Sequence, residues 1–171
     1  MAGCKINQNI ERAKAATVIL NNLVAQSYEL NVIFFGKGMD HHEAEGDNEY
    51  ALVKSSEKYQ TKKELEEKTR EIFSSDYSDQ IMEIAFQGFA GAVDNTASFS
   101  RYIETAEGLT IRTSYEPITV AEYDFSTTEI TKISKKFIQG KIMTTNFEKN
   151  EYVEITLINE NGEWRVDSAT Y

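Results

Sequence analysis

The sequence predicts an α+β fold, in which a long N-terminal helix and a short helix pair pack on a curved antiparallel sheet that forms a C-terminal meander. Apolar residues recur at spacings of three and four up to about residue 87, which is typical of helices, and alternate with polar residues after Ser98, which is typical of strands. Nine Tyr and nine Phe also favour a sheet packed against helices. We expect residues 1–8 to be a flexible N-terminus and residues 9–171 to form a single α+β domain.

The first predicted helix extends from about Asn7 to Phe35. One apolar stripe follows it at helical spacing, formed by Ile6, Ile10, Ala13, Ala16, Leu20, Leu23, Ser27, Leu30 and Phe34. Gly36 and Gly38 then predict its end, because glycine accepts the left-handed conformation common after a helix.

The most polar stretch, Met39 to Glu49, predicts a mobile loop followed by a short strand, Tyr50–Val53. Its five carboxylates are our candidates for contact with a partner: Asp40, Glu43, Glu45, Asp47 and Glu49.

A pair of helices is expected next. Thr61 and Glu64 fit a capping box, in which each side chain bonds the other residue's backbone N–H at the start of a helix. The expected buried face of this helix is Leu65, Thr69, Ile72 and Phe73. A third helix, 76–87, is expected to bury Ile81, Ile84, Ala85 and Phe86 before Gly88 and Gly91 end it.

Alternation then predicts seven strands, with turns at 148–151 and 159–162. The strands are Phe99–Glu104, Leu109–Thr113, Ile118–Phe125, Glu129–Ile138, Lys141–Phe147, Tyr152–Ile158 and Glu163–Thr170. Apolar and polar residues alternate most clearly in 152–158, which indicates one covered and one wetter face.

The formal net charge of −10 indicates which partners the chain attracts. Its long-range field repels nucleic-acid backbones and favours a basic protein or a cationic ligand. Lys135-Lys136 is the densest basic spot, so the sequence shows no basic run that would reverse this expectation.

A single cysteine, Cys4, excludes an intramolecular disulfide, and no stretch is apolar enough to span a membrane. Met1-Ala2-Gly3-Cys4 resembles the end of a bacterial lipoprotein signal, in which the cysteine receives lipid. If the chain is cut from a longer precursor, Cys4 would be the mature first residue and the protein extracytoplasmic. The alternative is an ordinary cysteine in a frayed terminus of a cytoplasmic protein.

No residue pattern predicts a catalytic, metal or cofactor site, and we expect a protein that is not an enzyme. His41 and His42 lie among carboxylates, but adjacent side chains in an extended segment point apart and would not share a metal ion. Glu122, Asp124 and Glu129 are expected to be solvated. Ten aromatic residues are interpreted as core, with a ligand pocket as the alternative: Phe86, Phe89, Phe99, Tyr102, Tyr115, Tyr123, Phe125, Phe137, Phe147 and Trp164.

Two resemblances to known families follow from the order of elements. The long helix, helix pair and meander, with 161–168 as last strand, are similar to the cystatin-like or nuclear-transport-factor-like cone folds. More specifically, Tyr50–Val53, then Thr61–Leu65 and Glu71–Ser74, followed by a short helix and the meander, resemble the IseA-type inhibitors of DL-endopeptidases and related Gram-positive lipoproteins. This resemblance implies a non-enzymatic extracytoplasmic domain that blocks cell-wall peptidases through an acidic surface, and it assigns no binding residue.

The leading hypothesis is therefore a binding or inhibitory domain that meets a basic protein, such as a cell-wall hydrolase. A cone-fold domain that binds a small molecule in an aromatic-lined pocket, or an enzyme of that fold, is the alternative. A scaffold subunit of an envelope assembly is a third, and it predicts a strong apolar patch on the outer face of the sheet.

Overall fold

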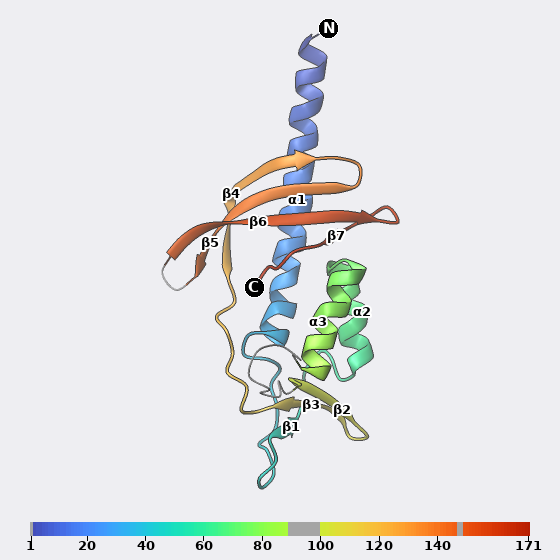
Figure 1. Cartoon of the computed structure of the whole chain (residues 1–171), viewed down its shortest axis with the longest axis vertical. Coiled ribbons are helices and arrows are strands. Elements are labelled where there is room, and N and C mark those ends of the chain that lie inside the picture. Colours follow the sequence, from blue (N-terminus) through green and yellow to red (C-terminus); the bar gives the residue numbers. More distant parts are fainter. Residues whose placement is uncertain (1, 89–99, 147–148) are drawn as a thin grey trace, which may run out of the picture. The chain divides into compact units, whose positions relative to one another are not determined.

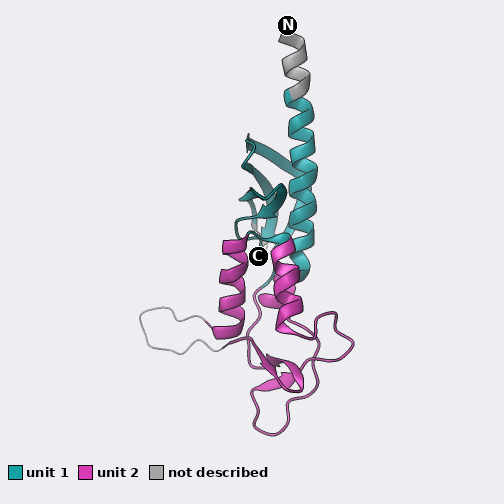
Figure 2. Ribbon diagram, turned by 90° about the vertical axis from the view of Figure 1, so that its right-hand side faces the viewer, with its two compact units in different colours: residues 1–29, 72–74, 119–171 teal, residues 30–71, 75–118 magenta. Residues whose placement is uncertain are grey.

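The computed structural model describes residues 2–88, 100–146 and 149–171, with side chains from residue 9 onward except those of 146 and 149. It confirms the α+β fold: three helices and two antiparallel sheets make up these residues (Figure 1). The chain divides into two compact units (Figure 2). Unit 1 comprises residues 1–29, 72–74 and 119–171, and unit 2 comprises residues 30–71 and 75–118. That residues 9–171 behave as a single domain stays a prediction, as does the flexibility of residues 1–8.

Unit 1 packs the N-terminal helix, α1 (Ala2–Phe34), on a four-stranded antiparallel sheet. The strands are β4 (Glu122–Ile133), β5 (Phe137–Asn146), β6 (Lys149–Glu160) and β7 (Glu163–Val166), adjacent in chain order. The inner face of this sheet and the helix share a buried apolar core that includes Leu20, Val24, Ile138, Ile142, Ile155 and Leu157. Burial of such side chains is the main stabilising contribution to this unit.

Helix and sheet approach each other closely at Gly140, on β5. A Cβ at this position would lie 2.9 Å from Leu20 Cδ1 and 3.1 Å from the Glu129 carbonyl oxygen. The sequence prediction placed a break between two strands here, whereas the glycine lies inside a continuous strand and lets α1 pack against it.

The two predicted strands 118–125 and 129–138 are wrong, because residues 122–133 form the single strand β4 and residues 137–138 already belong to β5. The register against β5 shifts between Asp124 and Glu129, which marks a β-bulge. The hydroxyls in the bulge have partners: Ser126 Oγ donates to Asp124 Oδ1 within the strand (2.6 Å), and Thr128 Oγ1 donates to Asn21 Oδ1 on α1 (2.7 Å). The chain instead reverses between β4 and β5, at residues 134–136.

Of the two turns predicted on either side of β6, one is confirmed and one is misplaced. The turn predicted at 148–151 is misplaced, because β6 already begins at Lys149. The turn at 159–162 is confirmed: Asn161 (φ 55°) and Gly162 (φ 95°) form the two-residue connection to β7 that right-handed strand twist favours.

The predicted C-terminal meander is confirmed by β4–β7, whereas unit 2 contains a second sheet that the single predicted sheet did not distinguish. β1 (Tyr50–Leu52), β3 (Gly108–Arg112) and β2 (Tyr102–Thr105) pair antiparallel in that order, apart from the four-stranded sheet. β1 joins the hairpin of β2 and β3 from far away in the chain, and alternation within a strand carries no information on such a pairing. The helices α2 (Lys62–Ile72) and α3 (Ser75–Gln87) belong to the same part of the chain.

A buried cation caps the C-terminal end of α1. Arg101, only 3% exposed, donates from Nε to the Ile33 carbonyl (3.0 Å) and from Nη2 to the Gly36 carbonyl (2.6 Å), and Tyr102 OH donates to Ile33 as well (2.8 Å). A positive group here suits the partial negative charge of a helix C-terminus. Gly38 (φ 81°) follows the helix end, as expected. Its missing side chain leaves room for Arg101, because a Cβ would lie 2.6 Å from that guanidinium.

The capping box at the start of α2 is confirmed. Glu64 N donates to Thr61 Oγ1 (3.2 Å), and Thr61 N donates to Glu64 Oε2 (3.0 Å). The N–H of Gln60 also donates to that carboxylate (2.7 Å) and is the main cause that lowers the pKa of Glu64.

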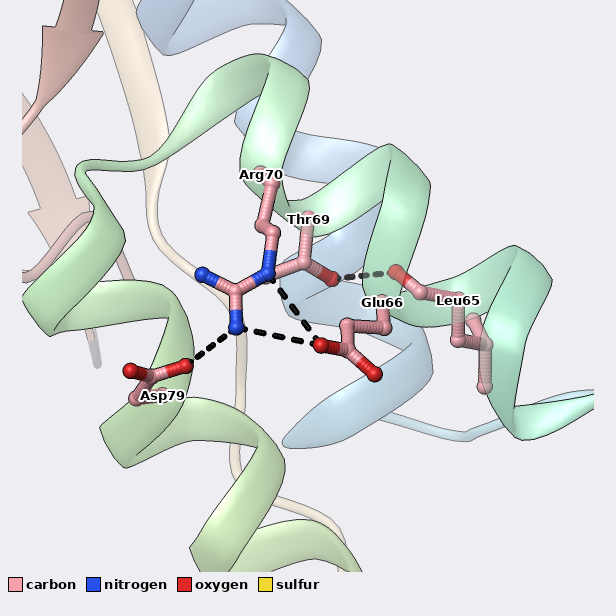
Figure 3. A network of polar contacts seen from close by, with 5 residues as sticks. All are labelled: Leu65, Glu66, Thr69, Arg70 and Asp79. Atoms are coloured by element: carbon pink, nitrogen blue, oxygen red, sulfur yellow. Dashed lines mark hydrogen bonds and ion pairs between the residues drawn. The ribbon is translucent and has the colours of Figure 1, made fainter. Parts of the chain in front are cut away.

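An exposed ion network links the two helices of unit 2 (Figure 3). Arg70 Nη2 donates to Glu66 Oε1 on its own helix (3.0 Å) and to Asp79 Oδ1 on α3 (2.5 Å). The hydrogen bond to Glu66 is the main cause that raises the pKa of Arg70. Thr69 lies between Glu66 and Arg70 in sequence, but its side chain is turned inward and donates to the Leu65 carbonyl (2.6 Å). The buried face predicted for this helix is confirmed at all four positions.

Candidate functional site

The polar stretch from Met39 to Glu49, called the acidic loop below, is held at both ends by hydrogen bonds to the sheet of unit 2. At its start, Lys54 N donates to the Asp40 carbonyl and His42 N donates to the Leu52 carbonyl (both 2.9 Å). At its end, Thr113 N donates to the Glu49 carbonyl (2.9 Å). The predicted loop is thus confirmed as a loop, and its backbone continues the hydrogen bonding of β1 and β3 on both sides.

An open groove of about 480 Å³ lies beside this loop. It is lined by residues from the loop, from all three strands of the sheet or their turns: His42, Glu43, Glu45, Asn48, Tyr50, Ala51, Leu52, Thr105, Glu107 and Thr110. Leu52 pairs in register with Thr110, and both lie on the face opposite the buried Ala51 and Ile111. Leu52 is 36% exposed, so the groove combines apolar surface with three carboxylates.

Two of the five predicted contact residues, Glu43 and Glu45, line this groove. Glu49 instead forms an ion pair with Arg112 (3.1 Å). Asp40 and Asp47 are exposed outside the lining. Asp40 and Asp47 therefore lie in the predicted loop without contributing to the groove.

The sequence prediction missed Glu107, the third carboxylate of the groove. It lies in the turn between β2 and β3, about 60 residues after the loop in the chain. The only local signal was Gly108 (φ 133°), which marks the turn but says nothing of what the turn faces.

Charge is distributed very unevenly between the two units. Unit 2 has nine basic and 17 acidic residues, a net charge of −8, whereas unit 1 has nine basic and 11 acidic residues, a net charge of −2. The groove therefore lies in the unit that carries most of the negative charge, and the field around it attracts cationic groups.

The residues considered for metal binding and catalysis have local structural contacts. His41 Nδ1 lies 2.7 Å from the His42 carbonyl oxygen, to which a protonated Nδ1 donates. Asp124 accepts hydrogen bonds from Ser126, and Glu129 pairs with Lys141 (3.1 Å). Over the described ranges, no three His, Cys, Asp or Glu side chains come together in a way that could hold a metal ion.

The displaced tyrosine pKa values belong to packed residues outside the groove. Burial raises the pKa of Tyr123 to about 12, and its ring stacks on Phe125 at 6.3 Å. Burial also raises the pKa of Tyr102, although Arg101 opposes the shift. These shifts report the packing of each unit.

Seven of the ten aromatic residues considered for a ligand pocket lie within the described residues, and none of these seven lines the groove. Phe86 packs on Tyr102 at 5.9 Å, and the guanidinium of Arg101 lies 3.9 Å above the Tyr115 ring. Phe89, Phe99 and Phe147 lie outside the described residues, as do Gly91 and the side chain of Cys4.

The outer face of the four-stranded sheet bears on the scaffold hypothesis. Phe137 and Tyr152 are exposed there, near opposite ends of the β5–β6 pair. The register pairs Lys141–Glu154 and Gln139–Thr156 lie between them, so polar side chains separate the two rings.

Among the helices of the described residues, none has an apolar stretch long enough to cross a bilayer. No protein-family model matches the chain, and no curated protein matches it either.

Proposed function

We propose that this protein is a non-enzymatic binding domain whose acidic groove in unit 2 accepts a basic segment of a protein partner. The observation that carries the proposal is the lining of the groove, where Glu43, Glu45 and Glu107 lie beside Leu52 in a unit of net charge −8.

The groove suits the two-part chemistry of a long basic side chain. Lys and Arg have an aliphatic stem that packs on apolar surface and a charged end that prefers carboxylates. Leu52 offers the first kind of contact and the three glutamates offer the second. The wider negative field would speed the encounter with a basic partner and make it sensitive to salt.

The resemblance to IseA-type inhibitors suggests the identity of that partner. Under this proposal the domain is extracytoplasmic, is anchored through lipid on Cys4, and inhibits a cell-wall peptidase by occupying its cleft with acidic surface. The acidic groove is compatible with such a role, and a basic cell-wall hydrolase is the partner class it favours.

Peptide titration tests the groove. A short peptide of alternating Lys and Ala is added to the ¹⁵N-labelled chain at about 150 mM salt, and amide shifts report where it binds. We expect saturable shifts around residues 42–52 and 105–110. We expect the triple variant Glu43→Gln, Glu45→Gln, Glu107→Gln to weaken binding about tenfold.

A matched control separates the groove from net charge. Glu67→Gln, Glu83→Gln and Glu116→Gln remove the same charge from exposed positions of the same unit. This control should retain binding within about threefold. Equal weakening by both triple variants would mean that only the overall field matters, and binding that ignores salt would contradict the electrostatic proposal.

The partner class needs its own measurement. Purified DL-endopeptidase is assayed on peptidoglycan with increasing amounts of the wild-type chain and of the two triple variants. We expect inhibition by the wild type and the control, and reduced inhibition by the groove variant. An enzyme unaffected by any of the three would remove the inhibitory part of the proposal and leave the peptide result standing.

A further inference from the structure

A second hollow, of about 250 Å³ and open to solvent, lies in unit 1 beside α1 and the end of β4. Its lining is Asn9, Arg12, Ala13, Ile130, Thr131, Lys132 and Ile133. Asn9, Arg12 and Ala13 share one face of the helix, since residues three and four apart are neighbours. The hollow is smaller than usual for a drug-sized ligand and suits a compact group.

The lining contains two cations and no carboxylate, although acids outnumber bases in the whole chain by 28 to 18. Three other cations of unit 1 have acidic partners: Lys14 pairs with Glu11 (3.3 Å), Lys141 with Glu129 (3.1 Å), and Arg165 with Glu163. Among the residues that the structure describes, Arg12 and Lys132 have no such partner. Their charges are therefore available to an anion from outside.

The donors beside this hollow match the oxygens of a phosphate group. An arginine presents paired N–H groups in a plane, a geometry that fits two phosphate oxygens. The Asn9 side-chain amide can donate as well, whereas Thr131 Oγ1 already donates to the Gln139 carbonyl (3.2 Å). Lys135 and Lys136 follow directly in an exposed turn that Ser134 Oγ holds by accepting from Lys136 N (3.1 Å).

We infer that this hollow is a phosphate-binding site, formed by Arg12, Lys132 and Asn9. The net charge of −10 does not prevent such binding, because charges more than about 8 Å away are largely screened at physiological salt. Screening also acts on the open hollow itself, so the affinity for an isolated phosphate should be weak, with a Kd on the order of 1 mM. The site is independent of the acidic groove, and neither proposal depends on the other.

Amide shifts of the ¹⁵N-labelled chain are followed while inorganic phosphate or glycerol phosphate is added, with chloride at equal ionic strength as reference. Sedimentation with phosphatidylglycerol vesicles, against phosphatidylcholine vesicles, tests whether a lipid phosphate serves as well. We expect saturable shifts at residues 9–13 and 130–133. We expect Arg12→Gln with Lys132→Gln to weaken binding at least about tenfold.

Lys14→Gln with Lys141→Gln is the matched control, because it removes two positive charges from α1 and the sheet of unit 1 outside the hollow. It should change the affinity less than about twofold. Saturable binding of the soluble phosphates, or of the anionic vesicles alone, supports the site if Arg12→Gln with Lys132→Gln abolishes it and the control does not. Shifts no larger than those with chloride, together with equal sedimentation of both vesicle types, would overturn the inference. So would binding that Arg12→Gln with Lys132→Gln leaves intact.

Discussion

The two units both combine helix and antiparallel sheet, but they close their cores by different means. In unit 1 the helix approaches the sheet at a glycine, and apolar side chains fill the space on either side. In unit 2 the buried guanidinium of Arg101 donates hydrogen bonds to the free carbonyls at the end of the same helix. Unit 2 also carries a net charge of −8 against −2 for unit 1. The comparison teaches that the negative charge is concentrated in the unit that contains the groove, while unit 1 has a local cationic hollow.

The largest effect is expected from Arg101→Met in unit 2. The substitution leaves the Gly36 carbonyl without its donor and removes the cation above the Tyr115 ring, while the apolar stem is kept. Loss of a buried charged hydrogen-bond donor should lower the free energy of unfolding by about 3 kcal/mol. Urea unfolding followed by circular dichroism measures the change.

Tyr102→Phe is the control for this substitution, because it removes one of two donors to the Ile33 carbonyl and leaves Arg101 in place. Tyr102→Phe should lower the free energy of unfolding by about 1 kcal/mol. If the two substitutions cost the same, the guanidinium would contribute no more than a single neutral hydrogen bond.

A smaller effect is expected from Gly140→Ala in unit 1. The new methyl group would lie 2.9 Å from Leu20 Cδ1 and 3.1 Å from the Glu129 carbonyl, so helix and sheet must move apart. Such overpacking should lower the free energy of unfolding by about 2 kcal/mol. Combining it with Leu20→Val, which removes the nearest atom, should cost less than the sum of the two single substitutions. Strict additivity would contradict the close contact.

Arg101→Met and Gly140→Ala together also test the prediction of a single domain. If residues 9–171 unfold cooperatively, either substitution shifts the whole transition, and hydrogen exchange accelerates in both units. If the units unfold separately, Arg101→Met accelerates exchange in unit 2 and Gly140→Ala in unit 1, each leaving the other unchanged.

The smallest effect concerns acid stability of the helix cap in unit 2. Hydrogen bonds, first from Gln60 N–H, lower the pKa of Glu64 in the folded state below its ordinary value of 4.5. The resulting stabilisation is fully present above pH 4.5 and is lost as the pH falls through the lower, folded-state pKa. We expect the urea midpoint of Glu64→Gln to fall less steeply than that of the wild type below pH 4.5. Parallel curves would mean that this carboxylate does not contribute.

The sequence by itself determined the features that depend on near neighbours. The capping box of Thr61 and Glu64, the turn at Asn161-Gly162 and the end of α1 before Gly36 all follow from local backbone chemistry, and each was predictable. The acidic loop was predictable for the same reason, including Glu43 and Glu45 as candidate contacts.

Only the tertiary structure decided what lies together from distant parts of the chain. Alternation gives the faces of a strand but not its partner, so the separation into two sheets was not predictable. Glu107 joins the acidic loop through the pairing of β1 with β3, and Lys132 joins Arg12 through the packing of β4 on α1. Gly140 resembled a strand break because glycine is typical of turns, and only its distance to Leu20 shows that it serves packing. Both proposed sites depend on such long-range contacts, which hydrophobic burial stabilises without leaving a local signal in the sequence.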